Sequence, residues 1–314
     1  MKPRGTIGAS DVAALFHEHP YMSYYTLWAR ESGLLAHEED ERTARQQIGL
    51  DLEKPVLEIW ARREGLQVFH NTRSLVNSSL SGLSATPDGL EHEHLAHAMP
   101  NSTLEYADTG AMLLEVESTQ DVKTVQPHER KQWLDGIPRY YWWQQQQQML
   151  VCGVSHGHLV ALFGVDRIEH TRIEADKEAH AKIIDAAATF WKQVRGELPA
   201  PEPDDHKSTL ATLMGQKRES KTFDLSAPNI DALARQIDEE IQMAAEAKSM
   251  AEKMHREAKS KMLRLLGDAD RGVFSDGSGY EIRTVSKKEF TVKASTSRQL
   301  KRFTNKDSET GEEE

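Results

Sequence analysis

One stretch of the chain, LLEVESTQDVKT at residues 113–124, restricts the fold more than any other part of the sequence. It begins like a buried strand, but it also carries Glu115, Glu117, Asp121 and Lys123. Alternate side chains of an extended strand lie on one face, so these four would project together from a regular strand. Carboxylates that lie close together repel each other unless a cation lies between them. The stretch therefore indicates either a strand that borders a charged site or a polar strand at a solvent-facing edge.

The overall composition limits the classes of protein that fit this stretch. The 314 residues carry a formal net charge of −11, which argues against a basic coat for nucleic acid. A local DNA-binding groove, or carboxylates gathered around metal ions, is compatible with that charge. The single cysteine, Cys152, excludes a disulfide framework and four-cysteine metal sites, and it is typical of a reducing cytoplasm. No apolar run approaches the roughly 20 residues that span a bilayer, and the first residues lack the apolar segment of a secretory signal.

The sequence predicts an α/β domain over residues 1–204, followed by an extension over residues 205–314. Proline and acidic residues in GELPAPEPDDH, at 196–206, mark the boundary between them. The spacing of apolar residues predicts the elements of the first domain. Helices are expected within 7–35 and over 49–65, 133–153 and 176–195, strands over 66–76, 111–125 and 156–165, and a loop over 91–109.

The extension is expected to contain a long helix and a small β-hairpin. Apolar residues recur every three or four positions over residues 228–266, and Pro228 and Gly267 are end signals. This pattern is typical of an arm that packs on the preceding domain or on a neighbouring chain. The turn sequence SDGSG favours a hairpin over residues 272–293, and the polar last twenty residues are typical of disorder.

A second acidic residue, Asp88, lies in a Pro-Asp-Gly turn well before the acidic strand. Taken alone, this turn needs no chemical explanation, because Pro-Asp-Gly is a favoured turn sequence. Together with Asp121-Val122-Lys123, however, it supplies two carboxylates and an ammonium group. Mg²⁺ is usually held by one or two carboxylates plus substrate phosphates, and an adjacent lysine can orient or deprotonate a metal-bound water. The combination predicts a Mg²⁺ site at which Mn²⁺ is expected to substitute.

Pro87-Asp88 and Asp121-x-Lys123 resemble the PD-(D/E)-x-K nuclease signature. This signature is short, but longer segments accompany it in a consistent order. They are IGASDVAALFHEHPYMSYYTLWARESGLL (7–35), GLDLEKPVLEIW (49–60), SATPDGL (84–90), WLDGIPRYYWWQQQQQMLVCG (133–153) and TFWKQVRGELPAPEPD (189–204). Over roughly residues 5–204 the chain resembles the lambda exonuclease/YqaJ-type viral recombinase family. The resemblance does not extend to the C-terminal third.

The resemblance implies a restriction-endonuclease-like α/β core, with a mixed central sheet flanked by helices, to which the long helix and hairpin are added. It implies an Mg²⁺-dependent 5′-to-3′ exonuclease that acts on the ends of linear double-stranded DNA. The product would be a 3′ single-stranded overhang for a partner annealing protein in phage-type homologous recombination. A ring-shaped homotrimer and a phage or prophage protein in the cytoplasm of a bacterial host are also implied. A structure-specific endonuclease or nickase of the same fold, and a non-catalytic DNA-binding or assembly protein, are the alternatives.

The resemblance also assigns roles to individual residues. Asp88 and Asp121 would bind the metal, and Lys123 would act on the water. Glu53 would help through the water shell of the metal, and Gln144 would lie on the helix that lines the site. The glutamine run that begins at Gln144 has the composition of a low-complexity tract, but its flanking aromatic residues favour a packed helix.

The chain departs from the family in its third core strand, which usually reads apolar-apolar-Glu-x-Lys. LLEVE has the apolar lead-in, but Glu117 occupies the lysine position. QDVKT, a few residues later, keeps the x-Lys ending. We therefore prefer Asp121 with Lys123 as the working pair, because a water-activating lysine accompanies that acid. Glu115 is the rival metal ligand.

Overall fold

The chain forms two compact units, one of Met1–Gln216 with Arg298–Glu314 and one of Lys217–Ser297. Each unit is described by itself below. The computed structural model describes residues 5–35, 43–91, 103–110, 116–215, 222–284 and 300.

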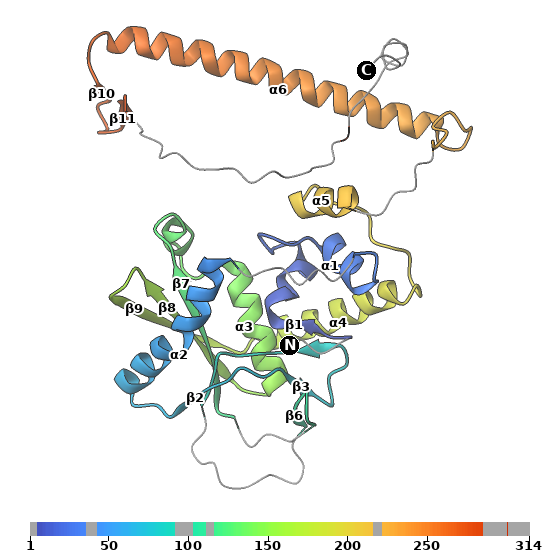
Figure 1. The fold of residues 1–314 in the computed structure, drawn as a ribbon, viewed down its shortest axis with the longest axis vertical. Coiled ribbons are helices and arrows are strands. Elements are labelled where there is room, and N and C mark those ends of the chain that lie inside the picture. Colours follow the sequence, from blue (N-terminus) through green and yellow to red (C-terminus); the bar gives the residue numbers. More distant parts are fainter. Residues whose placement is uncertain are drawn as a thin grey trace. The chain divides into compact units, whose positions relative to one another are not determined.

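The first unit is built around a five-stranded mixed sheet (Figure 1). β7 and β8 run parallel, whereas the other neighbouring strands run antiparallel. A mixed central sheet, expected from the sequence, is therefore confirmed. In spatial order its strands are β2 (Val68–His70), β5 (Gly89–Glu91), β7 (Ser118–Val125), β8 (His156–Phe163) and β9 (Arg167–Glu174).

β8 is the most buried strand of this sheet, and its apolar sequence explains why. Every residue after His156 in β8 is buried, and the parallel register runs from Thr119 opposite Gly157 to Val125 opposite Phe163. β9 pairs with β8 along its whole length, but its charged sequence RIEHTRIE is mostly exposed. Charged side chains are typical of an edge strand because they discourage pairing with another chain. No element was expected from the sequence at β9.

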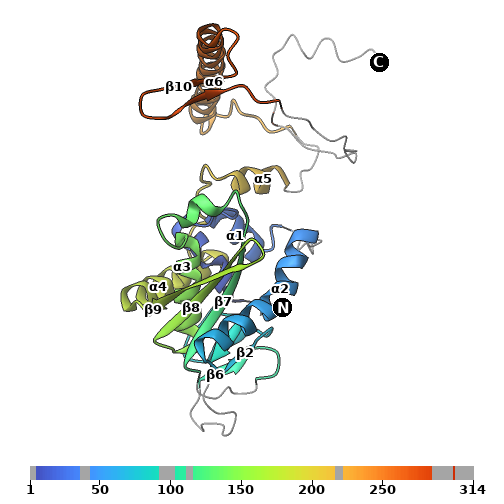
Figure 2. The same cartoon turned by 90° about the vertical axis from the view of Figure 1, so that its left-hand side faces the viewer.

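Helices cover both faces of the sheet (Figure 2). α2 (Ala44–Glu64) lies on one face, where Leu57 and Trp60 join a buried cluster with Val122 and Val160. A larger cluster lies on the opposite face and joins the remaining helices of the core to the sheet. These helices are η1 (Ala9–Phe16), α1 (Tyr24–Glu31), α3 (Arg139–Cys152) and α4 (Lys177–Val194). The expected arrangement of flanking helices is confirmed.

α2 is longer than the spacing of apolar residues predicted. It begins at Ala44 rather than Gly49, because Thr43 and Gln46 form a reciprocal capping box at its N-terminus. Its C-cap residue is Gly65, which has a φ of 73° and accepts the left-handed conformation without steric cost. The predicted C-terminal end is confirmed. The N-terminal end of α2 was predicted too late because its first residues are mostly polar and show no apolar periodicity.

The expected helical segment over residues 7–35 contains three separate elements. A short strand, β1 (Ile7–Gly8), comes first and pairs in parallel with β4 (Leu83–Ser84). The 3₁₀ helix η1 follows, and α1 begins after Ser23, whose hydroxyl accepts a hydrogen bond from the backbone of Thr26. Residues 17–23, which include His19 and Pro20, connect the two helices.

The expected strand over residues 66–76 is divided in two. β2 ends at His70, and β3 (Leu75–Asn77) belongs to a separate pair with β6 (Leu104–Tyr106). Asn71 makes the turn between them, because its side-chain amide donates to the carbonyl oxygen of Arg73 at 2.9 Å. β6 lies within the region 91–109 that was expected to be a loop, and residues 92–102 lie outside the described part of the chain.

α5 (Lys207–Gly215) packs on α1 although it follows the predicted boundary at residue 204. Hydrogen bonds between hydroxyl side chains link α5 to α1. Thr26 Oγ1 donates to Ser208 Oγ at 2.9 Å and lies 3.0 Å from Thr212 Oγ1. The compact first unit therefore includes α5, and the division into domains at 204 and 205 stays a prediction.

The second unit contains a long helix and a hairpin. α6 (Asp231–Leu266) is followed by Gly267 as its C-cap residue, and β10 (Arg271–Val273) pairs antiparallel with β11 (Gly279–Glu281). Both elements were expected from the sequence and are confirmed. Across the described ranges, no helix combines the length and the apolar character that a membrane crossing requires.

His158 on β8 is a buried histidine that should make the stability of the first unit depend on pH. Burial lowers the pKa of His158 to about 4 from its ordinary 6.5, and the positive charges of His156, His170 and Arg172 act in the same direction. Glu174 opposes this shift. The imidazole is therefore neutral in the folded protein at pH values where the unfolded chain binds a proton.

We expect the free energy of unfolding to fall as the pH drops from about 6.5 to about 4, the interval between the unfolded and folded pKa values of His158. The variant His158→Phe keeps an aromatic ring but cannot bind a proton, so its stability should fall less over this interval. Thermal unfolding of both proteins at closely spaced pH values measures the difference. Equal pH dependence in the two proteins would contradict the expectation.

Candidate active site

Asp121 is a carboxylate held in the interior of the first unit. It lies in the middle of β7 and is 1% exposed. Gln148 Nε2 donates to its Oδ1 at 3.1 Å, and Gln144 Nε2 donates to its Oδ2 at 2.5 Å. Lys123 Nζ lies 3.2 Å from the same Oδ2. A buried charge needs such partners, and together they fix the orientation of the Asp121 carboxylate.

The alternation along β7 separates its chemical face from its packing face. Asp121 and Lys123 face α3, where the glutamines lie, whereas Val122 packs with residues of α2. This agrees with the period of two in a strand, from which the sequence predicted that Asp121 and Lys123 share a face. The strand is therefore a central strand with one charged face rather than a polar solvent-facing edge.

The register of the sheet brings Asp88 beside Asp121. β5 and β7 are antiparallel, with Gly89 opposite Gln120. Continuing this register by one residue sets Asp88 opposite Asp121. Asp88 Oδ2 accepts a hydrogen bond from the backbone N–H of Val122 at 2.7 Å. The two acids that were singled out 33 positions apart in the sequence are thus neighbours across the sheet.

Asp88 is a carboxylate in an unfavourable electrostatic environment. Burial raises the pKa of Asp88 well above its ordinary 3.8, and the negative charges of Asp121 and Glu53 raise it further. The ammonium group of Lys123 and the hydrogen bond from Val122 oppose these effects without cancelling them. Acids brought together in this way favour a bound cation, which would lower the free energy of their charged forms.

Close packing, in addition to turn chemistry, explains the glycine of the Pro-Asp-Gly sequence. A Cβ atom at Gly89 would lie 2.8 Å from Val68 Cγ1 and 2.9 Å from Leu57 Cδ2, which is too short for carbon atoms. The backbone N–H of Asn71 donates to the carbonyl oxygen of Asp88 at 2.9 Å and holds the turn against β2. The glycine therefore lets α2 and β2 approach the start of β5, directly after Asp88.

Lys123 is a charged donor that is largely enclosed by the site. Its side chain is 20% exposed, and its Nζ lies 5.3 Å from the ring centroid of Tyr141. Burial alone would lower the pKa of Lys123, but the attraction of Asp121 and Asp88 outweighs burial and raises the pKa above its ordinary value. The side chain is therefore an ammonium group that donates hydrogen bonds at neutral pH.

The glutamine run on α3 is a packed helix in which each side chain has its own contact, as the flanking aromatic residues indicated. Gln144 and Gln148 bind Asp121, and Gln145 donates to Gln148 Oε1 at 2.9 Å. Gln146 Nε2 donates to the carbonyl oxygen of Glu174 at 2.9 Å. Gln147 Nε2 donates to the carbonyl oxygens of Ile7 and Ser84, at 2.8 and 2.9 Å, and so joins α3 to β1 and β4.

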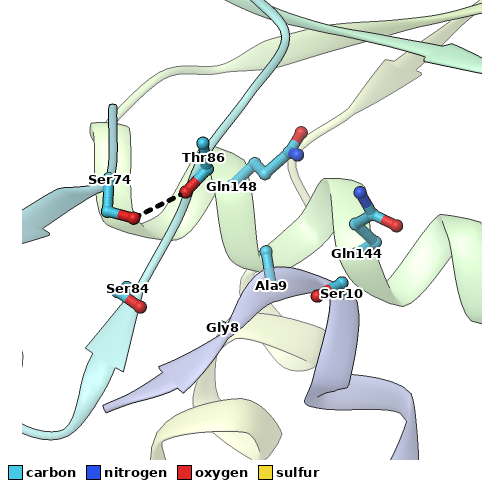
Figure 3. Close-up of a pocket in the computed structure, with 8 residues that line it drawn as sticks. All are labelled: Gly8, Ala9, Ser10, Ser74, Ser84, Thr86, Gln144 and Gln148. Carbon is cyan, nitrogen blue, oxygen red and sulfur yellow. Dashed lines mark hydrogen bonds between the residues drawn. The ribbon is translucent and has the colours of Figure 1, made fainter. Parts of the chain in front are cut away.

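A small polar pocket lies next to the amides that hold Asp121 (Figure 3). Its volume is about 150 Å³. Ser74 Oγ and Thr86 Oγ1 are 2.9 Å apart on its wall, where Figure 3 shows their hydrogen bond. The pocket is lined by Gly8, Ala9, Ser10, Ser74, Ser84, Thr86, Gln144 and Gln148. A polar group bound there would lie beside the carboxylate site, because Gln144 and Gln148 belong to both.

Three glutamates, Glu53, Glu115 and Glu117, are the remaining candidate residues. Glu53 lies on α2 and is close enough to raise the pKa of Asp88, so it belongs to the surroundings of the site. The backbone N–H of Glu117 donates to the carbonyl oxygen of Glu91, at the end of β5 that is remote from Asp88. Glu115 lies outside the described residues, so its rivalry with Asp121 stays a prediction.

The described residues supply two carboxylates rather than a complete metal cage. Among them, no group of three or more His, Cys, Asp or Glu side chains is arranged to hold a metal ion. Mg²⁺ and Mn²⁺ take oxygen ligands, and Mg²⁺ in particular is often bound by one or two carboxylates, waters and substrate phosphates. Asp88 and Asp121 fit that kind of site.

Comparison with known proteins identifies the first half of the chain. Residues 2–155 match the family model of the YqaJ-like viral recombinase domain. This segment is a YqaJ-like viral recombinase domain. The YqaJ-like domain includes Asp88, Asp121, Lys123 and the glutamine run, so the acidic site lies wholly within it. The family resemblance seen in the sequence motifs is confirmed.

Solved structures of exonucleases are similar to this chain at low sequence identity. An alkaline exonuclease (LHK-Exo) from Laribacter hongkongensis is 20% identical over 62% of this chain and 90% of its own, with a TM-score of 0.48. Its complex with dAMP gives 20% identity over the same shares and a TM-score of 0.47. A phage related exonuclease from Haemophilus somnus 129PT is 14% identical over 61% of this chain and 96% of its own, with a TM-score of 0.39. Among curated proteins, none matches this chain.

Gln148 is the site residue of the YqaJ-like domain that the sequence did not single out. It lies four residues after Gln144 on α3, and residues four apart share a face of a helix. That spacing could have predicted the role of Gln148, because a side chain four residues after Gln144 lies on the same face of the helix and can also reach the site. The uniform run of five glutamines concealed it.

Proposed function

We propose that this protein is an Mg²⁺-dependent exonuclease that degrades one strand of linear double-stranded DNA from its 5′ end. The product would be a 3′ single-stranded overhang, which a partner annealing protein would use in phage-type homologous recombination. The observation that carries the proposal is the convergence of Asp88, Asp121 and Lys123 across β5 and β7. The YqaJ-like viral recombinase domain supports a phage-type exonuclease.

In the proposed phosphodiester hydrolysis, the residues of the site have separate roles. A bound Mg²⁺ would supply positive charge that activates water and stabilises the charge developing on the scissile phosphate. Asp88 and Asp121 would hold it, and Glu53 would contact it through water. Gln144 and Gln148 keep the Asp121 carboxylate in a fixed orientation through their amide hydrogen bonds. Lys123 would donate hydrogen bonds to the phosphate or to the attacking water, because its raised pKa keeps it protonated.

The test is digestion of a 5′-phosphorylated linear duplex with and without Mg²⁺, with a different label on each strand. Nucleotides released from the 5′-phosphorylated strand only in the presence of Mg²⁺ would support the proposal. Release from 3′ ends would contradict the polarity. A parallel reaction on covalently closed circles would reveal nicking, which would favour an endonuclease. Binding without cleavage of either substrate would favour a non-catalytic DNA-binding protein. Mn²⁺ in place of Mg²⁺ should preserve the activity.

Replacing Lys123 with methionine should lower the rate of nucleotide release by about 10²–10³-fold, the usual cost of removing one aligned donor at a reacting centre. Lys123→Arg should retain more activity because it preserves the positive charge. Lys54, on α2, is exposed and forms an ion pair with Glu58 away from Asp121, so Lys54→Met is a matched control that should keep the normal rate. Single-turnover digestion measures all three variants. A Lys123→Met protein that is folded and fully active would contradict the proposed role.

Replacing Gln148 with methionine should lower the rate by about 10–100-fold, as is usual for residues that orient a metal ligand. The change leaves Asp121 Oδ1 and Gln145 Nε2 without the partner they share, so stability should fall by about 1–3 kcal/mol. Gln47→Met, at the exposed start of α2, is the matched control. The decrease should appear in the maximal rate rather than in the affinity for DNA, which an equilibrium binding assay would measure separately.

The proposed biological setting follows from the same family. The protein would act in the cytoplasm of a bacterial host, on DNA ends of phage or prophage origin, together with an annealing protein. We also propose that the first unit assembles as a ring trimer around its DNA. Co-purification with a candidate annealing protein, and the mass of the protein bound to a duplex end, would test these two points.

A further inference from the structure

α6 is a long helix that buries none of its residues within the second unit. Its 36 residues extend over roughly 54 Å at about 1.5 Å per residue. Leu233, Ile237 and Ile241 are 58%, 46% and 49% exposed, and Met254 is 64% exposed. Large apolar side chains in a row are costly to leave in water, and the residues described for the second unit bury no side chain of α6.

The row has the period of a coiled coil. The eleven residues that form it are separated by ten steps of three or four positions, and they span 35 positions in all, a mean of 3.5. A mean of 3.5 keeps a stripe facing a partner helix over many turns, whereas a straight helix repeats every 3.6 residues. The seam consists of Ile230, Leu233, Ile237, Ile241, Ala244, Ala247, Ala251, Met254, Ala258, Met262 and Leu265.

The charges of α6 show in which direction a partner helix would run. Residues 231–248 contain five acidic and two basic residues, a net charge of −3. Residues 249–266 contain two acidic and five basic residues, a net charge of +3. The helix dipole favours acids in the first turn and bases in the last turn only, so it does not explain Glu246 or Lys253 near the middle. Two antiparallel copies of α6 would set each acidic half against a basic half, whereas parallel copies would align like charges.

Apart from Ala258, the seam is also symmetric in side-chain size about its centre. Three alanines, Ala244, Ala247 and Ala251, occupy the middle, where small side chains let two helices approach closely. Ile237 and Ile241 precede the alanines, and the larger apolar residues of the other half follow them. An antiparallel partner with the same sequence therefore places the central alanines against each other and larger side chains against larger ones, except that Ala258 lies opposite Ile237.

We propose that α6 pairs with α6 of a second copy of this chain as an antiparallel two-stranded coiled coil. The pairing covers the seam along five heptads, and the complementary halves fix its direction. It does not depend on the nuclease function proposed above. It also does not depend on how the first units assemble, because each α6 needs one partner helix from another chain.

The first test is the mass of the full-length protein by light scattering. The variant Ile237→Gln/Ile241→Gln removes two seam side chains but keeps a residue of high helix propensity, so α6 should stay helical by circular dichroism. Its mass should be half that of the wild type. Leu263 lies outside the seam and is 53% exposed, so Leu263→Gln is the control and should leave the mass unchanged. An unchanged mass in the double variant, or a monomeric wild type at tens of micromolar, would overturn the proposal.

The second test determines the direction of the pairing. In a full-length protein with Cys152→Ala, single cysteines are placed at Leu233, at Ala258 or at Met262. The Leu233→Cys protein is mixed with the Ala258→Cys or the Met262→Cys protein and oxidised. Antiparallel helices should give a disulfide-linked dimer in at least one of the two mixtures, and either product supports the proposal. Leu233→Cys alone should not crosslink to itself. Efficient self-crosslinking of Leu233→Cys would show a parallel pair and would overturn it.

Discussion

Asp121→Asn should reduce the release of nucleotides from linear duplex DNA by about 10³-fold or more. The substitution keeps the shape of the side chain but removes the negative charge that would hold a metal ion, and metal charge is worth several kcal/mol in a transition state of this kind. Each 1.36 kcal/mol corresponds to a factor of ten in rate. Single-turnover digestion of a 5′-phosphorylated duplex, at saturating Mg²⁺, measures the effect.

Glu115→Gln is the decisive companion to Asp121→Asn because Glu115 is the rival ligand. We expect Glu115→Gln to keep a rate close to that of the wild type. Glu117→Gln should behave in the same way, because the backbone of Glu117 lies at the far end of β5 from Asp88. If Glu115→Gln were inactive while Asp121→Asn retained full Mg²⁺-dependent activity, the pairing of Asp121 with Lys123 as the working site would be wrong.

Asp88→Asn should have two opposite effects. Nuclease activity should fall by about 10³-fold or more, for the reason given for Asp121. In the absence of divalent metal, however, the melting temperature should rise at neutral pH. Burial and the charge of Asp121 raise the pKa of Asp88, so its ionised form destabilises the folded protein at neutral pH. Asparagine has the shape of aspartate without that charge.

The sign of this effect can be checked with pH. As the pH falls through the raised pKa of Asp88, the wild-type carboxyl becomes neutral, and the stability difference between the wild type and Asp88→Asn should shrink. Melting curves at several pH values in a chelating buffer would follow it, at about 2–4 °C for each 1 kcal/mol. Asp185→Asn, at an exposed position on α4, should show no such gain. A lower melting temperature for Asp88→Asn at neutral pH would contradict the prediction.

Local patterns in the sequence were sufficient for the elements with strong apolar periodicity. α4 and α6 carry such a pattern and β8 is a continuous apolar run, and all three were predicted with nearly the right bounds. α3 was expected over 133–153 but begins at Arg139, and its glutamine run gives no apolar periodicity. β9 was missed because its charged side chains carry no apolar signal, and its place in the sheet depends on hydrogen bonds to β8. β6 was missed for a similar reason. It lies in a polar region without apolar periodicity, and it forms a strand because it pairs with β3, which lies far away in the sequence.

The candidate site shows the same division between local and long-range information. Asp88, Asp121 and Lys123 could be selected from residue type and spacing alone. Their proximity could not, because it depends on the antiparallel register of β5 and β7. The close approach of Leu57 to Gly89 was equally out of reach, since it depends on the packing of α2 on the sheet.

The glutamine run has a consequence for how this gene can vary. Homopolymer runs often tolerate changes in length because their residues are interchangeable. Here one deletion would rotate all later residues of α3 by about 100° relative to the preceding ones, since a helix has 3.6 residues per turn. The contacts of Gln144 and Gln148 with Asp121, and of Gln147 with Ile7, could not then form together. A run that looks repetitive in the sequence is therefore constrained to a length of five.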